Sequence, residues 1–380
     1  MDLNFTESQR LLRSSLQAVL KRHCPQEYAR ACDQEKRPPT EALKALAENG
    51  WLGLTIPEEY GGIGGDVIDL AILLEETGHA MLDLALWIFR SITYGGQAIL
   101  QHGTEEQKRR FLPNVAKGKN IFCFGLTEPN AGSDAASITT HAELEGDHFV
   151  VNGRKMFTSG MGVSDYCLLV VRTDRKAERH RGISVLAVEC DSPGIAKSPI
   201  DVLCCWPIAT YDVVYGNVRV PKENLVGPLH GGWAGVLAYL EFERLCLSAA
   251  RIGASQDALD EAVVYAKERQ QFGRPIGKFQ AVSHMIAEMD MMVEIGRMMT
   301  YRYAWLLSQG CASRRDTAHL KLSTGETYKK VADMALQVFG GIGLAMEYDA
   351  QRHYRDSRLA TIGGGTSEIQ RNIIAKELGL

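Results

Sequence analysis

The spacing of apolar side chains divides this chain into three stretches. From residue 5 to about residue 116, apolar residues recur every three or four positions, which is the spacing of amphipathic helices. From about residue 120 to residue 225, the apolar residues tend to alternate with polar ones, as in half-buried strands. From residue 233 to the end of the chain the helical spacing returns. This order predicts a helical domain, a β domain and a second helical domain.

The middle stretch carries segments rich in β-branched and aromatic residues, which favour strands. These segments are residues 148–151, 166–172, 182–189 and 211–220. Asn152-Gly153 follows the first of them, and this dipeptide favours a tight turn between paired strands. We therefore expect a compact antiparallel β domain, closed into a small barrel or a sandwich.

In the last stretch, the predicted helices are residues 233–270, 279–309, 316–339 and 367–377. The second and the third are long and amphipathic, as in an antiparallel bundle. The predicted fold class is therefore α+β with several domains. These are an N-terminal α-helical domain (residues 1–119), a central antiparallel β domain (residues 120–228) and a C-terminal four-helix bundle (residues 229–380).

The composition excludes several classes of protein. Hydrophobic residues make up 45% of the 380 residues and charged residues 23%, which is typical of a soluble globular protein. The net charge of −4 provides no basic face for nucleic acid, and there is no apolar run of about eighteen residues to span a membrane. The polar N-terminus lacks the features of a signal or transit peptide, so we expect a cytoplasmic protein.

The cysteines and histidines give no sign of a metal site. The nine cysteines form no Cys-x-x-Cys motif, and the ten histidines form no His-Glu-x-x-His motif. Zinc sites are built on such spacings. Cys204 and Cys205 are the only adjacent pair. The sequence therefore predicts reduced thiols and no bound metal.

One acidic residue interrupts an apolar stripe in the first predicted helix of the C-terminal domain. Val236, Leu240 and Leu247 share one helix face, and Glu243 lies on that same face. A carboxylate that faces a core loses hydration, which raises its pKa. A general base that works near neutral pH needs this shift. Taken alone, the position is more typical of a buried glutamate that is held by an arginine.

Two loops in the middle stretch combine small residues with hydroxyl groups. Residues 127–134 (Thr-Glu-Pro-Asn-Ala-Gly-Ser-Asp) follow an apolar run, and their amides and serine hydroxyl suit a flat heterocycle or a phosphate. Residues 155–160 place Phe157 beside the hydroxyls of Thr158 and Ser159. Each segment alone is also typical of an ordinary surface turn or an edge strand.

Three segments with glycines interrupt the C-terminal helices. Residues 269–280 (RQQFGRPIGKFQ) contain arginines that suit a pyrophosphate, because arginine binds phosphate oxygens in a bidentate manner. Residues 337–343 end a helix with glycines, as many helices do. Residues 363–370 (GGGTSEIQ) place three glycines before a capping box, so a ligand can approach free helix amides. An interhelical loop, a helix end and a flexible connector are the competing interpretations.

In this order, these segments resemble the acyl-CoA dehydrogenase family, which are flavoenzymes that desaturate acyl thioesters at the α,β bond. The resemblance also includes residues 5–9 (FTESQ) and 57–62 (PEEYGG), and it covers essentially the whole chain. It implies the helical–β–helical fold of that family. It also implies an acyl-CoA substrate and an FAD that is bound noncovalently between the β domain and the C-terminal bundle.

The resemblance implies two groups of FAD-binding residues. One group would contact the cofactor of its own subunit: Phe124, Leu126, Thr127, Ser133, Phe157, Thr158, Ser159, Thr366, Ser367 and Glu368. The other would contact the FAD of a neighbouring subunit: Arg269, Gln271, Phe272, Phe279, Gln280, Gln337, Gly340 and Gly341. A shared site implies an oligomer, namely a homotetramer built as a dimer of dimers. The positions that match contacts around the CoA thioester are Ser133, Glu241 and Arg244.

The resemblance also implies where the catalytic base lies. Many family members carry a catalytic glutamate immediately before the Gly-Thr-Ser of the last loop, where this chain has Gly364. A second group, which includes the isovaleryl-type enzymes, carries it on the helix that contains Glu243-Arg244. This chain is similar to that second group. The helical periodicity and the resemblance therefore point independently to Glu243.

In the reaction that the resemblance implies, Glu243 removes the α proton while the β hydrogen passes as hydride to the flavin. The amide of Gly364 and a ribityl hydroxyl of FAD would bind the thioester carbonyl and stabilise its developing charge. An electron-transfer flavoprotein would then accept the electrons. Residues 87–92 and 236–240 would line the acyl pocket, and they do not identify the acyl chain.

One departure keeps other functions open. Before the strand at residues 211–220, many members have Gly-x-Arg, whereas residues 203–207 here read Leu-Cys-Cys-Trp-Pro. The alternatives are an acyl group on a carrier protein, an enoyl-CoA reductase that runs in reverse, and a non-oxidative lyase or desulfinase with FAD. Relatives of the last kind lack a carboxylate at both catalytic positions, so Glu243 argues against it. A non-catalytic flavin-binding protein is disfavoured because the base and the FAD loops are all present.

Overall fold

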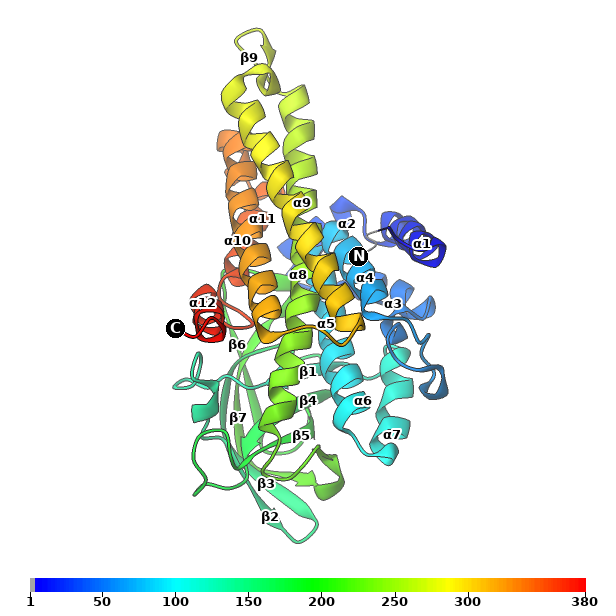
Figure 1. Cartoon of the computed structure of the whole chain (residues 1–380), viewed down its shortest axis with the longest axis vertical. Helices are drawn as coiled ribbons and strands as arrows, with labels where there is room; N and C mark the ends of the chain where they lie inside the picture. The colour runs from blue at the N-terminus through cyan, green and yellow to red at the C-terminus, as the bar shows by residue number, and fades with distance from the viewer. Residues whose placement is uncertain (1–3) are drawn as a thin grey trace.

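The N-terminal helices pack against one side of a long central helix. The computed structural model describes residues 4–380, and Figure 1 shows its arrangement. Side chains at the N-termini of several helices cap their free amides. Thr6 and Gln9, for example, form a reciprocal capping box at the start of the first helix. The helices are α1 (Glu7–His23), α2 (Gln26–Gln34), α3 (Thr40–Glu48), α4 (Val67–Ala80), α5 (Leu82–Arg90), α6 (Ala98–His102) and α7 (Glu105–Ala116). A π-helical segment, Ser91–Gln97, joins α5 to α6.

The central domain is a sheet whose strands run in the order β6-β7-β3-β2-β4-β5-β8, with β1 paired to β4. Neighbouring strands are antiparallel, except that β1 and β2 each pair with β4 in parallel. Its apolar core includes Phe149, Leu169 and Val213, all of which are buried. The strands are β1 (Phe122–Gly125), β2 (His141–Glu145), β3 (His148–Ser159), β4 (Tyr166–Arg172), β5 (Ile183–Glu189), β6 (Ile195–Ile200), β7 (Thr210–Pro221) and β8 (Leu225–Val226).

The prediction of a hairpin turn at Asn152-Gly153 was wrong. Strand β3 continues through this dipeptide, and the chain turns instead between β2 and β3, at Gly146-Asp147. The pairing of β3 with β7 shifts register between Val151 and Gly153, so the dipeptide forms a bulge. A Cβ on Gly153 would lie only 2.5 Å from Thr140 Oγ1, so glycine serves a close approach within the sheet.

The C-terminal domain is helical, and α8 (Trp233–Glu268) packs against α4, α9 and α10. The long helices rise above the sheet and end in a small hairpin of β9 (Gln270–Gln271) and β10 (Arg274–Pro275) at the top of Figure 1. The other helices are α9 (Gln280–Ser308), α10 (Arg314–Phe339), α11 (Ala350–Ala360) and α12 (Ser367–Glu377). The predicted fold class is confirmed, whereas α11 was not predicted.

None of the helices within residues 4–380 combines the length and the apolar character that a membrane crossing requires.

A buried ion pair fixes the loop at residues 127–134 to strand β3. Lys155 Nζ lies 2.8 Å from Glu128 Oε1, and both side chains are buried. Burial alone would raise the pKa of Glu128. The Lys155 ammonium and hydrogen bonds from Thr139 and Thr140 outweigh burial and lower this pKa to about 2. The loop is therefore held from inside the domain.

Replacing one partner of this pair tests its contribution. Glu128→Gln leaves the Lys155 ammonium buried without a counter-charge, which costs about 3–5 kcal/mol. We expect the melting temperature to fall by several degrees, whereas Glu143→Gln, in an exposed pair with Arg175, should change it little. Because the pKa of Glu128 is lowered on folding, its stabilisation is present above its unfolded pKa and is lost as pH falls towards about 2. Equal melting temperatures for the two variants would contradict this assignment.

Candidate active site

Glu243 lies on α8 where that helix passes between the N-terminal helices and the last loop. Its side chain is only 8% exposed, and Oε2 accepts a hydrogen bond from Tyr94 Oη at 2.9 Å. Burial raises the pKa of Glu243, although the Tyr94 hydrogen bond and the charges of Arg244 and Arg251 partly oppose the shift. The structure thus places the carboxyl in the core, as the apolar stripe of the sequence predicted.

The loop before α12 brings its backbone to this carboxyl. Gly364 has a left-handed φ of +70°, and a Cβ built on it would lie 3.7 Å from Glu243 Oε1. The same Cβ would lie 3.3 Å from Leu247 Cδ1, so a larger residue would occupy space beside the carboxyl. The Gly364 carbonyl accepts a hydrogen bond from Arg244 Nε at 3.2 Å. The two positions proposed for a catalytic carboxylate therefore converge.

Two further cations act on Glu243, and neither was predicted from the sequence. Lys321 on α10 donates a hydrogen bond to the Gly365 carbonyl. Burial, Arg251 and Arg244 together lower the pKa of Lys321 to about 7. Burial likewise lowers the pKa of Arg251 to about 10. Arg251 lies on α8 with Glu243, about two turns further along, whereas Lys321 is brought to Glu243 from α10 by the fold.

The end of β1 lies next to the Glu243 site, and the end of β3 carries an exposed aromatic ring. The Phe124 ring stacks on the Tyr94 ring with centroids 4.6 Å apart, which connects β1 to the tyrosine that contacts the base candidate. Phe157, at the end of β3, is 55% exposed. Thr158 is buried, and its Oγ1 has no hydrogen-bond partner in the described chain. An exposed aromatic face beside an unsatisfied hydroxyl suits a flat polar ring.

The other predicted positions are distributed over three places. The segment that follows β1 carries Leu126, Thr127 and Ser133, and Ser133 is exposed. Thr366 caps α12, which begins with Ser367 and Glu368, next to the Gly364 loop. The rest of the FAD set lies around the hairpin and the end of α10, near the upper end of the bundle in Figure 1: Arg269, Gln271, Phe272, Phe279, Gln280, Gln337, Gly340 and Gly341.

The two remaining substrate candidates point to different neighbours. Arg244 contacts the Gly364 loop, as described above. Glu241 is only half-buried, and its carboxylate lies 3.6 Å from Arg314 Nε at the start of α10. The structure therefore joins Arg244, but not Glu241, to the Glu243 site.

Trp206 occupies the segment that lacks the expected arginine. Its ring lies 3.7 Å from the Arg355 guanidinium carbon and 4.9 Å from Lys36 Nζ. Arg355 in turn bonds Asp33 at 2.6 Å. An aromatic ring between two cations thus joins this loop to α2 and α11.

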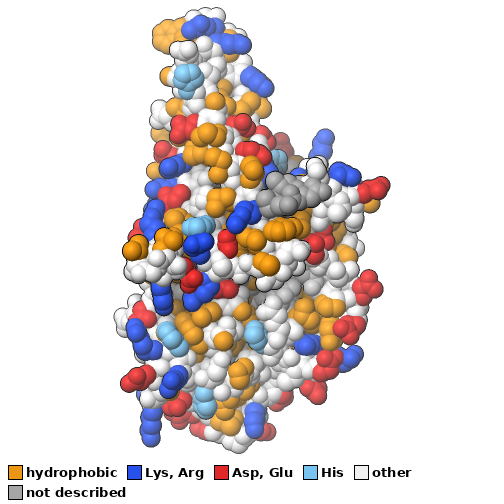
Figure 2. Space-filling model, in the orientation of Figure 1, with side chains coloured by type: hydrophobic (Ala, Val, Ile, Leu, Met, Phe, Trp, Pro, Cys, Tyr) orange, Lys and Arg blue, Asp and Glu red, His pale blue; other side chains and the backbone are white. Residues whose placement is uncertain are grey.

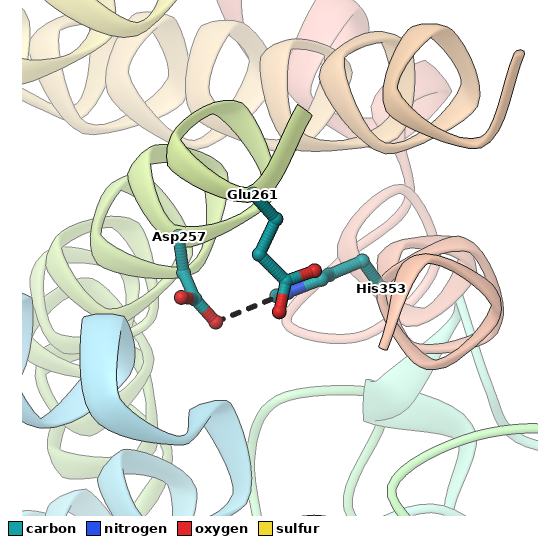
Figure 3. A group of neighbouring side chains, drawn as sticks. All are labelled: Asp257, Glu261 and His353. Atoms are coloured by element: carbon teal, nitrogen blue, oxygen red, sulfur yellow. Dashed lines mark hydrogen bonds and ion pairs between the residues drawn. The ribbon is translucent and has the colours of Figure 1, made fainter. Parts of the chain in front are cut away.

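A group of carboxylates and a histidine joins α11 to α8. Asp257 and Glu261 lie one turn apart on α8, and His353 on α11 faces them (Figure 3). His353 Nε2 lies 3.1 Å from Asp257 Oδ2, and Nδ1 lies 3.1 Å from Tyr328 Oη. Arg352 already supplies positive charge to both carboxylates. We assign this group to the packing of α11 against α8.

Comparison with known proteins decides the family. Residues 6–119, 123–218 and 230–379 match the N-terminal, middle and C-terminal domains of acyl-CoA dehydrogenases. The chain belongs to the acyl-CoA dehydrogenase family. A probable acyl-CoA dehydrogenase of Bacillus subtilis is 36% identical over 379 residues, which cover 100% of both chains. The chain described here is therefore an oxidoreductase of the acyl-CoA dehydrogenase family.

Two further relatives bear on the cofactor and the partner. A subunit of the caffeyl-CoA reductase–Etf complex of Acetobacterium woodii is 33% identical over 98% of both chains. The FAD complex of PigA has a TM-score of 0.94 and 29% identity, with 100% of both chains covered.

FAD is the cofactor of this family, and the residues present fit it. The exposed ring of Phe157 and the unpartnered hydroxyl of Thr158 offer a stacking face and a hydrogen bond. A Cβ on Gly132 would meet no atom within 4 Å, so the loop after β1 faces open space. Gly340 and Gly341 at the far end of α10 are equally open.

The hydrogen bond from Tyr94 should have a measurable effect on the pKa of Glu243. This bond favours the charged carboxylate, so Tyr94→Phe should raise the pKa of Glu243 further. Infrared difference spectroscopy, with Glu243→Gln as the reference that lacks the carboxyl band, should show ionisation at higher pH. Tyr215→Phe, a buried tyrosine of the β domain, is the matched control and should cause no shift. An unchanged or lowered pKa in Tyr94→Phe would contradict the contact.

Proposed function

We propose that this chain dehydrogenates an acyl-CoA thioester at the α,β bond, with Glu243 as the base that removes the α proton. The observation that carries the proposal is the buried carboxyl of Glu243 beside the backbone of Gly364. In this respect the chain resembles the isovaleryl-type members, which have a small residue in the last loop.

The surroundings of Glu243 suit proton abstraction. Its raised pKa gives the carboxylate greater proton affinity than an exposed glutamate has. Tyr94 holds the side chain in place, so less reorganisation is needed. The amide of Gly364 is the proposed donor to the thioester carbonyl, whose oxygen gains negative charge as the α proton leaves. The bound FAD supplies the acceptor for the β hydrogen.

We propose an electron-transfer flavoprotein as the redox partner, because the Acetobacterium woodii relative is a subunit of a complex with Etf. That relative is a reductase, so enoyl-CoA reduction is the second candidate for the physiological direction. A carrier-protein thioester is the other alternative. Anaerobic mixing with linear, branched and aryl acyl-CoA thioesters, and with their carrier-protein counterparts, distinguishes these substrates through the flavin absorbance.

We also propose a homotetramer arranged as a dimer of dimers. On α9, Met291, Ile295 and Met298 are about half-exposed and share one helix face. Figure 2 shows hydrophobic side chains along the front of the bundle. Phe272, at the tip of the hairpin, is 92% exposed. Such exposed apolar surface is typical of an interface. A second subunit would also let the hairpin residues reach the FAD of a neighbour.

Glu243→Gln tests the base directly. The amide is nearly the same size but accepts a proton far less readily, so we expect normal FAD content and a loss of about 10²-fold or more in the rate of flavin reduction by substrate. Stopped-flow absorbance measures this rate, and Glu143→Gln, at an exposed glutamate of the β domain, is the control. Reduction at the wild-type rate would show that Glu243 is not the base.

The convergence of the two positions predicts a rescue. Glu243→Gly combined with Gly364→Glu places a carboxylate on the other side of the same space, so we expect activity above that of Glu243→Gly alone. Recovery should be partial, because a glutamate at a left-handed φ costs about 1–2 kcal/mol. Flavin reduction by substrate is the measurement. Complete inactivity with normal FAD content and thioester binding would count against the convergence.

A further inference from the structure

Arg90, the last residue of α5, is a buried cation without a full set of partners. Its side chain is 4% exposed, and Nε donates to the Leu86 carbonyl at 3.1 Å. Nη1 and Nη2 are both buried, and neither has a hydrogen-bond partner among residues 4–380. No carboxylate in the described chain forms an ion pair with it. A guanidinium in this state lacks acceptors for the donors that it normally presents.

The position of Arg90 connects it to the Glu243 site. It lies four residues before Tyr94, which donates to Glu243, and the π-helical segment Ser91–Gln97 that carries this tyrosine begins directly after Arg90. The guanidinium packs on the Trp87 ring, with its carbon 4.4 Å from the ring centroid. It also packs on Gly160, where an added Cβ would lie 2.2 Å from Nη1. Gly160 directly follows Phe157–Ser159, so Arg90 belongs to the segment expected to line the acyl pocket (residues 87–92) and also packs against the end of the predicted flavin-binding segment.

Within residues 4–380, no side chain supplies a counter-charge to Arg90. Burial lowers the pKa of Arg90 to about 10, so it remains charged at neutral pH. Asp83 lies near the start of the same helix, α5, and its Oδ1 is also buried without a hydrogen-bond partner among the described residues. Burial and the neighbouring Asp356 and Asp33 raise the pKa of Asp83 well above its usual range, which favours its neutral form. An unpaired buried charge is costly, and a bound anion removes this cost.

We propose that Arg90 binds a carboxylate carried at the distal end of the acyl group, so that the substrate is a dicarboxylic acid attached to CoA through one end. This inference rests on the proposed function. The two free nitrogens suit the bidentate geometry in which arginine binds a carboxylate. Tyr94, which contacts Glu243, lies only four residues from Arg90. A short acyl chain whose α carbon lies at Glu243 would therefore carry its distal carboxylate towards Arg90.

The test compares thioesters of equal carbon number with and without a terminal carboxylate. Hexanoyl-CoA and adipoyl-CoA form such a pair. Isothermal titration calorimetry on the FAD-loaded Glu243→Gln protein measures binding without turnover. We expect adipoyl-CoA to bind at least about tenfold more tightly than hexanoyl-CoA. Tighter binding of hexanoyl-CoA would overturn the proposal. This comparison is made on protein that retains Arg90, so it does not depend on whether an Arg90 variant folds.

Substitution of Arg90 then assigns the selectivity. In Glu243→Gln/Arg90→Met, the ratio of adipoyl to hexanoyl affinity should fall at least about tenfold, and Arg90→Lys should retain part of it. Arg30→Met, which removes a partly buried arginine paired with Asp349, is the matched control and should leave the ratio unchanged. An unchanged ratio in Arg90→Met, or loss of FAD in place of altered selectivity, would contradict the role. Equal binding of adipoyl-CoA and its terminal amide would contradict recognition of a charge.

The same thioesters separate this inference from the proposed function. If hexanoyl-CoA and adipoyl-CoA both reduce the flavin of the unsubstituted enzyme but adipoyl-CoA shows no advantage, only the role of Arg90 is wrong. If no acyl thioester of either kind reduces the flavin, the dehydrogenase proposal itself is wrong.

Discussion

The burial of one carboxyl group constrains the rest of this structure. Glu243 is withdrawn from solvent on a helix that packs against the N-terminal helices and the C-terminal bundle. A carboxyl in such surroundings has a raised pKa, yet it still needs hydrogen-bond donors and nearby positive charge. Arg251 lies on the same helix, and the fold supplies the others from separate segments: Tyr94 from the N-terminal domain and Lys321 from α10. A displacement of any of these segments would change the ionisation of the same group.

The loop before α12 lies against this carboxyl, at the place that we propose for the thioester. Glycine at position 364 permits the left-handed backbone and leaves the space next to Glu243 free of a side chain. Arg244 fixes the loop through the Gly364 carbonyl, and Lys321 fixes it through the Gly365 carbonyl. The position of the base and the absence of a side chain at position 364 are thus two parts of one arrangement. This arrangement is the basis of our proposal that a carboxylate at either position reaches the same carbon.

Local patterns in the sequence were sufficient for some features but not for others. The apolar stripe on α8 predicted the burial of Glu243, because helical periodicity alone determines which face a residue occupies. Tyr94, Lys321 and Arg90 could not be predicted, since their importance depends on contacts between segments far apart in the chain. The dipeptide Asn152-Gly153 predicted a turn, but in the structure it forms a bulge within strand β3. Local propensity thus indicated an irregular backbone without indicating its kind.

Exchange of the α hydrogen with solvent tests the role of Glu243 most directly. Phenylacetyl-CoA has acidic α hydrogens and no β hydrogen, so proton removal can be observed without oxidation. We predict that the FAD-loaded enzyme incorporates deuterium from D₂O at the α carbon, measured by mass spectrometry, and that Glu243→Gln does not exceed the rate without enzyme. Equal deuterium incorporation by both proteins would contradict the account, because proton removal would then not require this carboxyl.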